Sequence, residues 1–276
     1  MRLGAHLSIE NGYIGALEKA KTIGANCLQI FSTSPRGWKA DYPKFAKQYL
    51  EEFGSTQTKL DIAPVYFHAS YLINLADANQ IGFLSKKRLV KELLIADLFG
   101  IRGTIIHTGS FKTEQPNYLK LKDNLNYILE RISQNVLLII ENAGNRKIGK
   151  TIEEIGYIIK LVKDRRLKVC LDTCHLHAAG YDISSKQNLD KFLDAFDKEI
   201  GLERLELWHV NDSKDEFGSL RDRHENISLG KIGNQVFEIL LNHRDTRDYR
   251  FITEVPGFDG TGPDKQNIDI LKNLVI

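Results

Sequence analysis

Eight apolar runs of strand length recur along the chain, and each is followed by a segment in which apolar residues have helical spacing. The runs are residues 2–8, 25–33, 63–69, 103–109, 136–143, 169–171, 206–212 and 250–257. Runs that are apolar almost throughout are typical of strands in a parallel sheet that is buried on both faces. This alternation predicts an α/β protein, a (β/α)8 TIM barrel that forms a single domain over residues 1–276. A doubly wound open sheet is the alternative architecture.

Local signals predict where some of the helices begin and end. An apolar face from Phe45 to Phe53 predicts a helix that stops at Gly54. Thr151 and Glu154 form a capping box at the start of another helix, and Asp264 is the expected cap of the last one. The small residues at 178–180 predict a loop soon after the sixth run.

Composition and charge narrow the class of protein. Hydrophobic residues make up 42% of the chain and charged residues 27%, which is typical of a globular protein with a large core. The formal net charge of +2 does not by itself indicate a nucleic-acid binder, so a polyanion would have to meet a local basic patch. The three cysteines lie in apolar surroundings and are expected to be reduced core residues. Neither a signal peptide nor a membrane span is expected, and we predict a cytoplasmic location.

Polar side chains that can bind a metal ion stand at the ends of six runs: His68, His107, Glu141, Asp172, His209 and Glu254. His175 follows shortly after Asp172, and Asp222 and His224 lie in the segment after the seventh run. A single histidine at a strand end is more often a hydrogen-bonded structural residue than a ligand. In a (β/α)8 barrel, however, the carboxyl ends of all strands meet at one rim, so these side chains are expected to converge.

The predicted set exceeds the needs of one ion, because a catalytic zinc ion takes about three protein ligands and a water molecule. It therefore predicts two or three metal ions. Imidazole and carboxylate ligands without thiolate favour zinc, with manganese or iron as alternatives, and Cys170 and Cys174 are weak candidates. His6 could support a ligand, whereas His177 and His243 are expected to be packing or surface residues. Several divalent cations among carboxylates would attract a phosphate group and stabilise its transition state.

Seven motifs, distributed over nearly the whole chain, carry further information. They are GAHLS at 4–8, HASYLINL at 68–75, IHTGS at 106–110, ENAG at 141–144, CLDTCHLHAAGYD at 170–182, HVNDSK at 209–214 and DRHENI at 222–227. Together they resemble the endonuclease IV family of zinc-dependent apurinic/apyrimidinic (AP) endonucleases.

The resemblance implies a TIM barrel that holds three zinc ions. One zinc ion would take His68, His107 and Glu141. A second would share Glu141 and bind three further residues, Asp172, His209 and Glu254. A third would take His175, Asp222 and His224.

The resemblance also implies the reaction and the partner. A hydroxide between the first two zinc ions, with Glu141 and Glu254 as catalytic carboxylates beside it, would attack the phosphorus 5′ to an abasic site in duplex DNA. The products would be a 3′-hydroxyl and a 5′-deoxyribose phosphate. The protein is expected to act as a monomer.

Two loops are predicted to contact the DNA. Tyr71 and Leu72 are apolar residues in a loop where polar residues are expected, and apolar wedges in a minor groove kink the duplex. Ile73 could equally pack beneath a neighbouring helix. The resemblance places Arg36 in the same groove. A local basic patch is expected from Arg36, Lys39, Lys214, Arg221 and Arg223.

Two segments depart from the family pattern. Residues 141–146 form a shorter segment than the usual ENTAGQG and lack its glutamine, and Ser228-Leu229-Gly230 stands where Gly-Glu-Gly is usual. Neither change removes an expected ligand, so we expect them to affect loop geometry and turnover. Two other functions remain open, a divalent-metal sugar isomerase on the same barrel and a protein that recognises DNA damage without cutting it.

Overall fold

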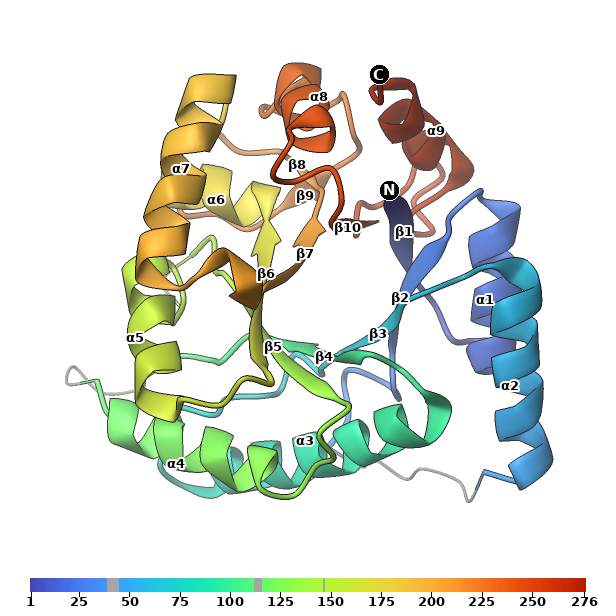
Figure 1. The fold of residues 1–276 in the computed structure, drawn as a ribbon, viewed down its shortest axis with the longest axis vertical. Coiled ribbons are helices and arrows are strands. Elements are labelled where there is room, and N and C mark those ends of the chain that lie inside the picture. Colours follow the sequence, from blue (N-terminus) through green and yellow to red (C-terminus); the bar gives the residue numbers. More distant parts are fainter. Residues whose placement is uncertain (39–44, 112–115, 146) are drawn as a thin grey trace.

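The chain folds into a closed barrel of parallel strands (Figure 1), and the computed structural model describes residues 1–38, 45–111, 116–145 and 147–276. The strand order around the barrel is β1-β10-β7-β6-β5-β4-β3-β2. These strands are β1 Arg2–Leu7, β2 Cys27–Phe31, β3 Val65–His68, β4 Gly103–Ile106, β5 Leu137–Glu141, β6 Leu167–Asp172, β7 Leu205–His209 and β10 Arg250–Thr253. The predicted (β/α)8 barrel is confirmed, and because the sheet closes on itself, the open doubly wound alternative is wrong.

Helices surround the barrel on its outer side (Figure 1). They are α1 Gly12–Thr22, α2 Lys47–Leu60, α3 Gln80–Phe99, α4 Tyr118–Leu129, α5 Ile152–Val162, α6 Thr173–Ala179, α7 Lys186–Glu199, α8 Asn234–Asn242 and α9 Lys265–Asn273. A short 3-10 helix, Leu202–Arg204, precedes β7, and two antiparallel strands, β8 Asp212–Ser213 and β9 His224–Glu225, pair in the segment after β7. Helix α7 shows the general arrangement, since its residues Leu189, Phe192, Leu193 and Phe196 are buried at helical spacing.

The predicted helix ends are partly confirmed. Thr151 Oγ1 accepts a hydrogen bond from the Glu154 amide at 3.2 Å, and Asp264 Oδ1 accepts one from the Asn267 amide at 2.9 Å. The predicted stop at Gly54 is wrong, because α2 ends at Leu60. The next residue, Asp61, is the C-cap and has a left-handed backbone with a φ of 53°. A single glycine within a helix costs only about 1 kcal/mol, so it does not end a helix by itself.

Apolar side chains fill the part of the barrel interior that precedes the last residues of the strands. They are Cys27, Tyr66, Ile105, Leu137, Ile139, Cys170, Leu207 and Ile252. The three cysteines are free and buried, as predicted, and burial raises the pKa of the Cys27 thiol to about 12. This part of the barrel interior is therefore an ordinary packed core. Polar groups that carry out chemistry are expected at the carboxyl ends of the strands.

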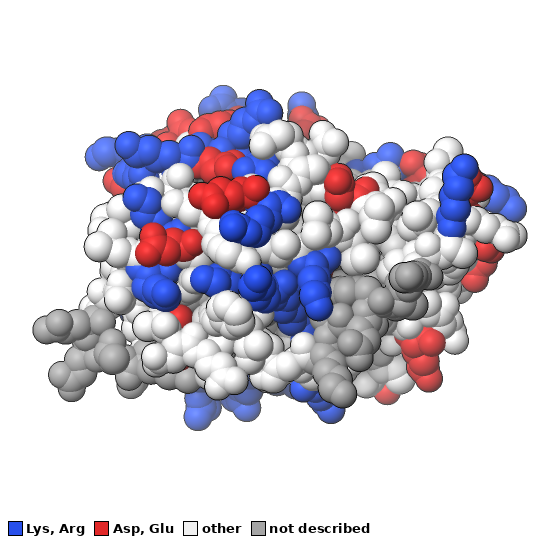
Figure 2. Space-filling view, turned by 90° about the horizontal axis from the view of Figure 1, so that it is seen from below, with Lys and Arg blue, Asp and Glu red and all other residues white. Residues whose placement is uncertain are grey.

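The outer wall formed by α3 and α4 carries a cluster of basic side chains (Figure 2). Lys86 Nζ lies 4.6 Å, Lys87 Nζ 5.5 Å and Arg131 Cζ 3.7 Å from the centre of the Tyr127 ring. Such cation–π contacts contribute about 0.5–1 kcal/mol each at exposed sites. The two lysine contacts tie α3 to α4 on the outside of the barrel.

The helices in the described part of the chain include none with the length and apolar character that a membrane span requires.

Candidate metal centre

The nine side chains singled out at the strand ends converge at the carboxyl end of the barrel. Their potential ligand atoms form three groups, and within each group the atoms lie within 4.8 Å of one another. The groups are His68, His107 and Glu141; Glu141, Asp172, His209 and Glu254; and His175, Asp222 and His224. These groups have the same members as the three sets that the resemblance implies, while their role as metal ligands stays a prediction.

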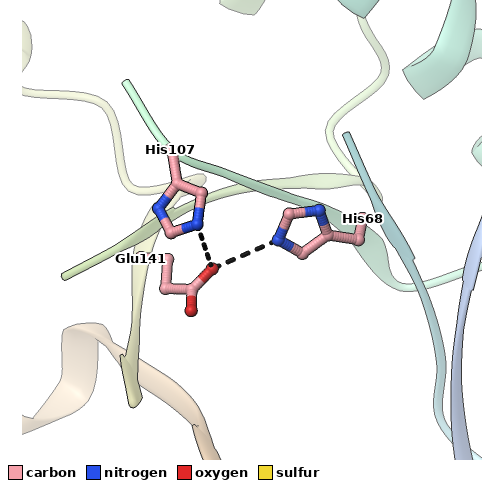
Figure 3. A group of neighbouring side chains, drawn as sticks. All are labelled: His68, His107 and Glu141. Atoms are coloured by element: carbon pink, nitrogen blue, oxygen red, sulfur yellow. Dashed lines mark hydrogen bonds and ion pairs between the residues drawn. The ribbon is translucent and has the colours of Figure 1, made fainter. Parts of the chain in front are cut away.

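Glu141, at the end of β5, lies at the centre of the arrangement and is fully buried. Its Oε2 atom is 3.2 Å from His68 Nε2 and 3.5 Å from His107 Nε2 (Figure 3). The other oxygen, Oε1, is 3.0 Å from His209 Nδ1 and 3.3 Å from His175 Nδ1. Burial would raise the pKa of Glu141, but the histidines around it, His107 and His209 foremost, hold that pKa well below its ordinary value. Glu141 is therefore a carboxylate that four imidazoles share.

Hydrogen bonds to the protein orient three of these histidines. His68 Nδ1 lies 2.9 Å from the Ala69 carbonyl oxygen, and His175 Nδ1 lies 2.9 Å from the Asn142 carbonyl oxygen. His209 Nε2 lies 2.8 Å from Gln29 Oε1. A ring nitrogen that faces a carbonyl oxygen must carry the proton, so the other nitrogen is left for a metal ion. This arrangement is the usual one for metal-binding histidines.

His175 reaches the centre from a helix that the sequence did not predict. The small residues at 178–180 were expected to form a loop, but Ala178 and Ala179 complete α6, which ends at Gly180 with a φ of 90°. Asp172 caps this helix, because its Oδ1 atom accepts a hydrogen bond from the His175 amide at 2.9 Å. The sequence did not predict this helix, because its seven residues offer too few apolar positions to show a helical period.

The distances between potential ligand atoms fit shared metal ions. His224 Nε2 lies 3.5 Å from Asp222 Oδ1 and 3.7 Å from Asp172 Oδ2. Two ligands that are each about 2.1 Å from one tetrahedral ion are themselves about 3.4 Å apart. His224 Nε2 is also buried without a hydrogen-bond partner in the described part of the chain. Together with the imidazole and carboxylate composition, these observations mean that the residues present fit divalent metal ions.

The carboxylates and histidines of the centre shift one another's pKa values. Burial would raise the pKa of Glu254 and Asp222, but His209 lowers the first and His175 lowers the second, so both stay charged. Burial raises the pKa of Asp172 and lowers that of His107 to about 4. A buried, neutral imidazole beside several carboxylates is suited to bind a cation.

The remaining cysteine and histidine predictions fit a packing role. Cys174 lies near Asp172 and His224, but burial raises the pKa of its thiol to about 12, which disfavours the thiolate that binds metals. A further group, Asp190, His243 and Asp245, lies outside the centre. Both nitrogens of His243 are engaged there, with Nε2 2.8 Å from Asp190 Oδ1 and Nδ1 accepting from the Asp245 amide at 3.2 Å.

Two cavities open beside the centre, and Tyr71 lines both. The larger has a volume of about 1040 Å³ and is also lined by Arg36, His6, His224 and Glu254. The smaller, of about 320 Å³, is lined by Leu72 and by Lys147. Tyr71 is 68% exposed, whereas Ile73 is buried in the core, so the packing interpretation of Ile73 is confirmed.

The loops that carry Arg36 and Tyr71 are fastened to each other and to α3. Ser70 Oγ donates a hydrogen bond to the Pro35 carbonyl oxygen at 2.6 Å. Arg88, a buried residue of α3, donates to Thr33 Oγ1 at 3.1 Å, to the Ser34 carbonyl oxygen at 3.2 Å and to the Gly37 carbonyl oxygen. The exposed side chains of Arg36 and Tyr71 are thus presented from a braced surface.

The predicted basic patch is weaker than the sequence suggested. Arg223 Nη2 lies 2.5 Å and Arg221 Nη1 3.5 Å from Asp215 Oδ1. Lys214 Nζ lies 4.0 Å from Glu225 Oε2, and Lys39 falls outside the described residues. Arg36 remains exposed beside the larger cavity. The sequence could not show this pairing, because it depends on how the segment after β7 folds back on itself.

The segments that depart from the family pattern lie near residues of the centre along the chain, since one begins with Glu141 and the other comes four residues after His224. Ser228 has a φ of 76° and Leu229 is 61% exposed. A Cβ atom at Gly230 would meet Asp212 Oδ1 at 2.3 Å, so the glycine permits the amide of Gly230 to donate to Asp212 Oδ2 at 3.0 Å. In the other segment, Arg146 lies outside the described residues, and Lys147, directly after this segment, lines the smaller cavity.

Sequence reasoning missed two residues at the site, Gln29 and Lys147. Gln29 is fully buried in β2, and a glutamine within the otherwise apolar run CLQIF was a signal that could have found it. Lys147 gave no such signal, because a lysine in a polar loop is ordinary. Its charge contributes to the lowered pKa of His107, although burial is the larger cause.

Comparison with known proteins gives three levels of similarity. Residues 17–274 match the family model described as a xylose isomerase-like TIM barrel. The probable endonuclease 4 of Thermosipho africanus is 35% identical, with 100% of this chain and 99% of that protein covered. The crystal structure of endonuclease IV from Thermus thermophilus has a TM-score of 0.86 at 32% identity, covering 99% and 98%. A 3-keto-D-glucoside 4-epimerase from E. coli shares the fold, with a TM-score of 0.68 at 15% identity, covering 99% and 98%.

Proposed function

The chain belongs to the endonuclease IV family, and from this premise we propose that it cleaves the phosphodiester bond 5′ to an abasic site in duplex DNA by means of a multinuclear zinc centre. Membership makes the chain a DNA-repair nuclease of the AP endonuclease type. The position of the cut, the metal identity and the number of ions are the parts that we propose.

One observation supports the proposal most strongly, the division of nine buried or half-buried side chains into three groups, the first two of which share Glu141. A sugar isomerase on this barrel needs fewer ligands, and a structural metal site needs no cavity in front of it. Here the larger cavity borders His68, His107, His175, Asp222, His224 and Glu254, so substrate would meet members of all three groups.

We assign the ligands as the three groups divide them. His68, His107 and Glu141 would hold the first ion, and Asp172, His209 and Glu254 would join Glu141 at the second. The third ion would be held by His175, Asp222 and His224. Zinc ions so placed act as Lewis acids that neutralise charge on the phosphodiester and on the leaving oxygen.

The catalytic carboxylates are assigned to Glu141 and Glu254. Glu254 lines the larger cavity, and its Oε2 atom lies 3.2 Å from His209 Nδ1. Its pKa lies well below the ordinary value, because the effect of His209 outweighs that of burial. It is therefore a charged acceptor that can take a hydrogen bond from a water molecule aligned with the phosphorus. Glu141 is wholly buried, so it acts by holding the first two groups together.

Arg36, Tyr71 and Leu72 are assigned to the DNA. Tyr71 stands between the two cavities, exposed on one side and in edge-on contact with Phe31 at a ring distance of 5.4 Å. An aromatic and an aliphatic side chain at this position can enter the minor groove and hold the duplex bent. An abasic nucleotide needs no base pair broken to leave the helix, so the bend favours its entry into the larger cavity.

The decisive experiment is to incubate protein of measured metal content with a duplex that carries one abasic site and to map both new ends. We expect cleavage on the 5′ side, a 3′-hydroxyl and a 5′-deoxyribose phosphate, with zinc in the active protein. A parallel assay on small ketoses and aldoses tests the isomerase alternative. Metal-loaded protein that binds the abasic duplex and leaves it intact would reject the nuclease proposal in favour of damage recognition alone.

A further inference from the structure

Gln29 is a fully buried amide on β2, between Leu28 and Ile30. A buried carboxamide is costly unless its donors and acceptor are all engaged. The apolar core at this level of the barrel offers no such partners. Gln29 instead reaches the metal centre, where it contacts side chains from three other strand ends.

Three contacts define its position. Gln29 Oε1 lies 2.8 Å from His209 Nε2, and Gln29 Nε2 lies 2.5 Å from Glu254 Oε1 and 2.9 Å from His6 Nδ1. His6 Nδ1 is in turn 2.8 Å from Glu254 Oε1. His6 lies on β1, His209 ends β7 and Glu254 directly follows β10, so one side chain of β2 joins the ends of three other strands.

The chemistry of the partners fixes which end of the amide faces which residue. Glu254 is a carboxylate and can only accept, so it must face the amide nitrogen of Gln29. The amide oxygen then faces His209 Nε2, which must carry the proton and donate. The network therefore leaves the unprotonated lone pair of His209 on Nδ1 when a metal ion is bound.

That nitrogen points at the second ligand group. His209 Nδ1 lies 3.0 Å from Glu141 Oε1, 3.2 Å from Glu254 Oε2 and 3.8 Å from Asp172 Oδ2. Glu254 is held in the complementary way, since Gln29 and His6 engage Oε1 and leave Oε2 toward His209. A single amide thus orients two of the four side chains in this group.

We propose that Gln29 is the positioning residue of the group formed by Glu141, Asp172, His209 and Glu254: it sets the tautomer of His209 and the rotation of Glu254, and so determines the affinity of that group for zinc. The proposal rests on the metal-binding part of the proposed function. It does not depend on DNA, because Gln29 is buried beneath the ligands and reaches no surface.

The test replaces Gln29 with methionine, which has a similar length and no hydrogen-bonding groups. Zinc affinities of wild type and Gln29→Met are measured by competition with a chromophoric chelator, without DNA. Loss of a residue that orients a metal ligand weakens metal binding about 10–100-fold. We expect a loss of this size for one class of site, while the other sites keep their affinity.

A matched control separates positioning from general damage to the fold. Asp190→Asn weakens the contact to another buried histidine, His243, whose Nε2 lies 2.8 Å from Asp190, in the outer layer of helices. It is expected to lower the melting temperature without changing zinc affinity. Where Gln29→Met does not fold, Gln29→Leu provides a second apolar replacement, and the same measurement applies.

Kinetics on the abasic duplex give an independent readout. Gln29→Met should lower kcat at limiting zinc and leave KM within about two-fold, because the residue touches no substrate surface. Unchanged zinc affinity in a folded variant, or an equal loss at every site, would overturn the proposal. Wild-type protein that binds zinc and fails to cut would reject the proposed function and leave this inference standing, since affinity is read without substrate.

Discussion

Two buried glutamates at opposite ends of the barrel interior show how differently the same strands are used. Glu206, at the start of β7, is paired within the chain, with Tyr66 Oη at 2.9 Å and Arg102 Nε at 3.1 Å. Glu141, at the end of β5, faces four imidazoles at 3.0 to 3.5 Å, and two further carboxylates belong to one of its groups. The first end is satisfied by the chain alone, whereas the second has more acceptors than fixed cations.

This difference indicates that Glu206 has a structural role and that the end of the barrel around Glu141 has a functional one. A buried carboxylate with a guanidinium and a hydroxyl partner has its charge and hydrogen bonds satisfied, and removing a partner is destabilising because it leaves a buried charge unpaired. A buried set of carboxylates and imidazoles has no such fixed cation, so bound metal ions would take the place of protons on the imidazoles and neutralise the carboxylates. Functional sites commonly break the local rules that the rest of a fold obeys.

The largest expected effect comes from Glu141→Gln at the mouth of the barrel. We expect the rate of incision to fall about 10³-fold or more, because a neutral amide can no longer balance the cations shared by the first two groups. Binding to abasic DNA should partly survive, since the cavity and the exposed rim are unchanged. Single-turnover cleavage of a defined duplex and a binding titration measure the two quantities.

Glu206→Gln is the matched change at the other end of the barrel. It removes a buried carboxylate from its Arg102 and Tyr66 partners, and the free energy of unfolding should fall by about 1–3 kcal/mol. The incision rate of the folded fraction should stay within about two-fold of wild type. If both variants lost the same activity, or if Glu141→Gln cleaved DNA normally, the assignment of a structural role to Glu206 and a functional role to Glu141 would be wrong.

Removal of the metal ions should affect only the carboxyl end of the barrel, and we expect the next largest effect from it, a lower melting temperature. At free zinc about 1,000 times the dissociation constant, bound metal stabilises the fold by about 4 kcal/mol. For a chain of this size, a chelator should therefore lower the melting temperature by about 10 °C. Glu206→Gln should show the same decrease, and Glu141→Gln a smaller one. Identical melting curves with and without chelator would contradict a metal centre at the mouth.

The sequence predicted the mouth better than its surroundings. Strand ends such as His107 and Glu254 could be found because apolar runs stop abruptly, and barrel closure brings all such ends to one rim. Helix starts at Thr151 and Asp264 could be found because capping is local chemistry. These features depend on few residues that are close in sequence.

Features that depend on distant contacts could not be predicted. The continuation of α2 past Gly54 and the short helix after Asp172 depend on packing and capping within the folded chain. Ile73 was ambiguous because burial of a single loop residue leaves no periodic signal. The pairing of Arg223 with Asp215 required the folded loop, since charge alone predicted a free basic patch.

A third buried carboxylate, Glu92 on α3, extends the comparison to the layer between barrel and helices. Burial raises its pKa to about 7, and Ser32 Oγ donates to its Oε2 atom at 2.5 Å. Because this pKa is higher in the folded chain than in the unfolded one, the folded state holds the proton more tightly. The stability that the bound proton contributes is present below about pH 4.5 and is lost as the pH rises through about 7.

We therefore expect Glu92→Gln to gain stability relative to wild type as the pH is raised from 5 to 8, by as much as about 3 kcal/mol. Denaturant unfolding of metal-free wild type and variant at a series of pH values measures this difference. Titrations that are the same in the two proteins cancel, and the charge of His68, which lowers the pKa of Glu92, acts on the wild type alone. Parallel pH profiles would show that Glu92 is ionised throughout, paired with a cation as Glu206 is.

The smallest effect concerns the rim of the mouth, where Tyr71 is 68% exposed and makes edge-on contact with Phe31. Tyr71→Ala should raise KM for the abasic duplex about 10-fold, because one aromatic contact to a base contributes about 1–3 kcal/mol. Tyr157 on α5 is the matched control, since it is 48% exposed and meets Tyr118 of α4 edge-on at a ring distance of 5.1 Å, among the helices outside the barrel. Tyr157→Ala should leave KM unchanged, and neither variant should alter zinc affinity. An unchanged KM in Tyr71→Ala would mean that Tyr71 does not help to select abasic DNA. Recognition would then depend on the charged groups of the metal centre inside the barrel.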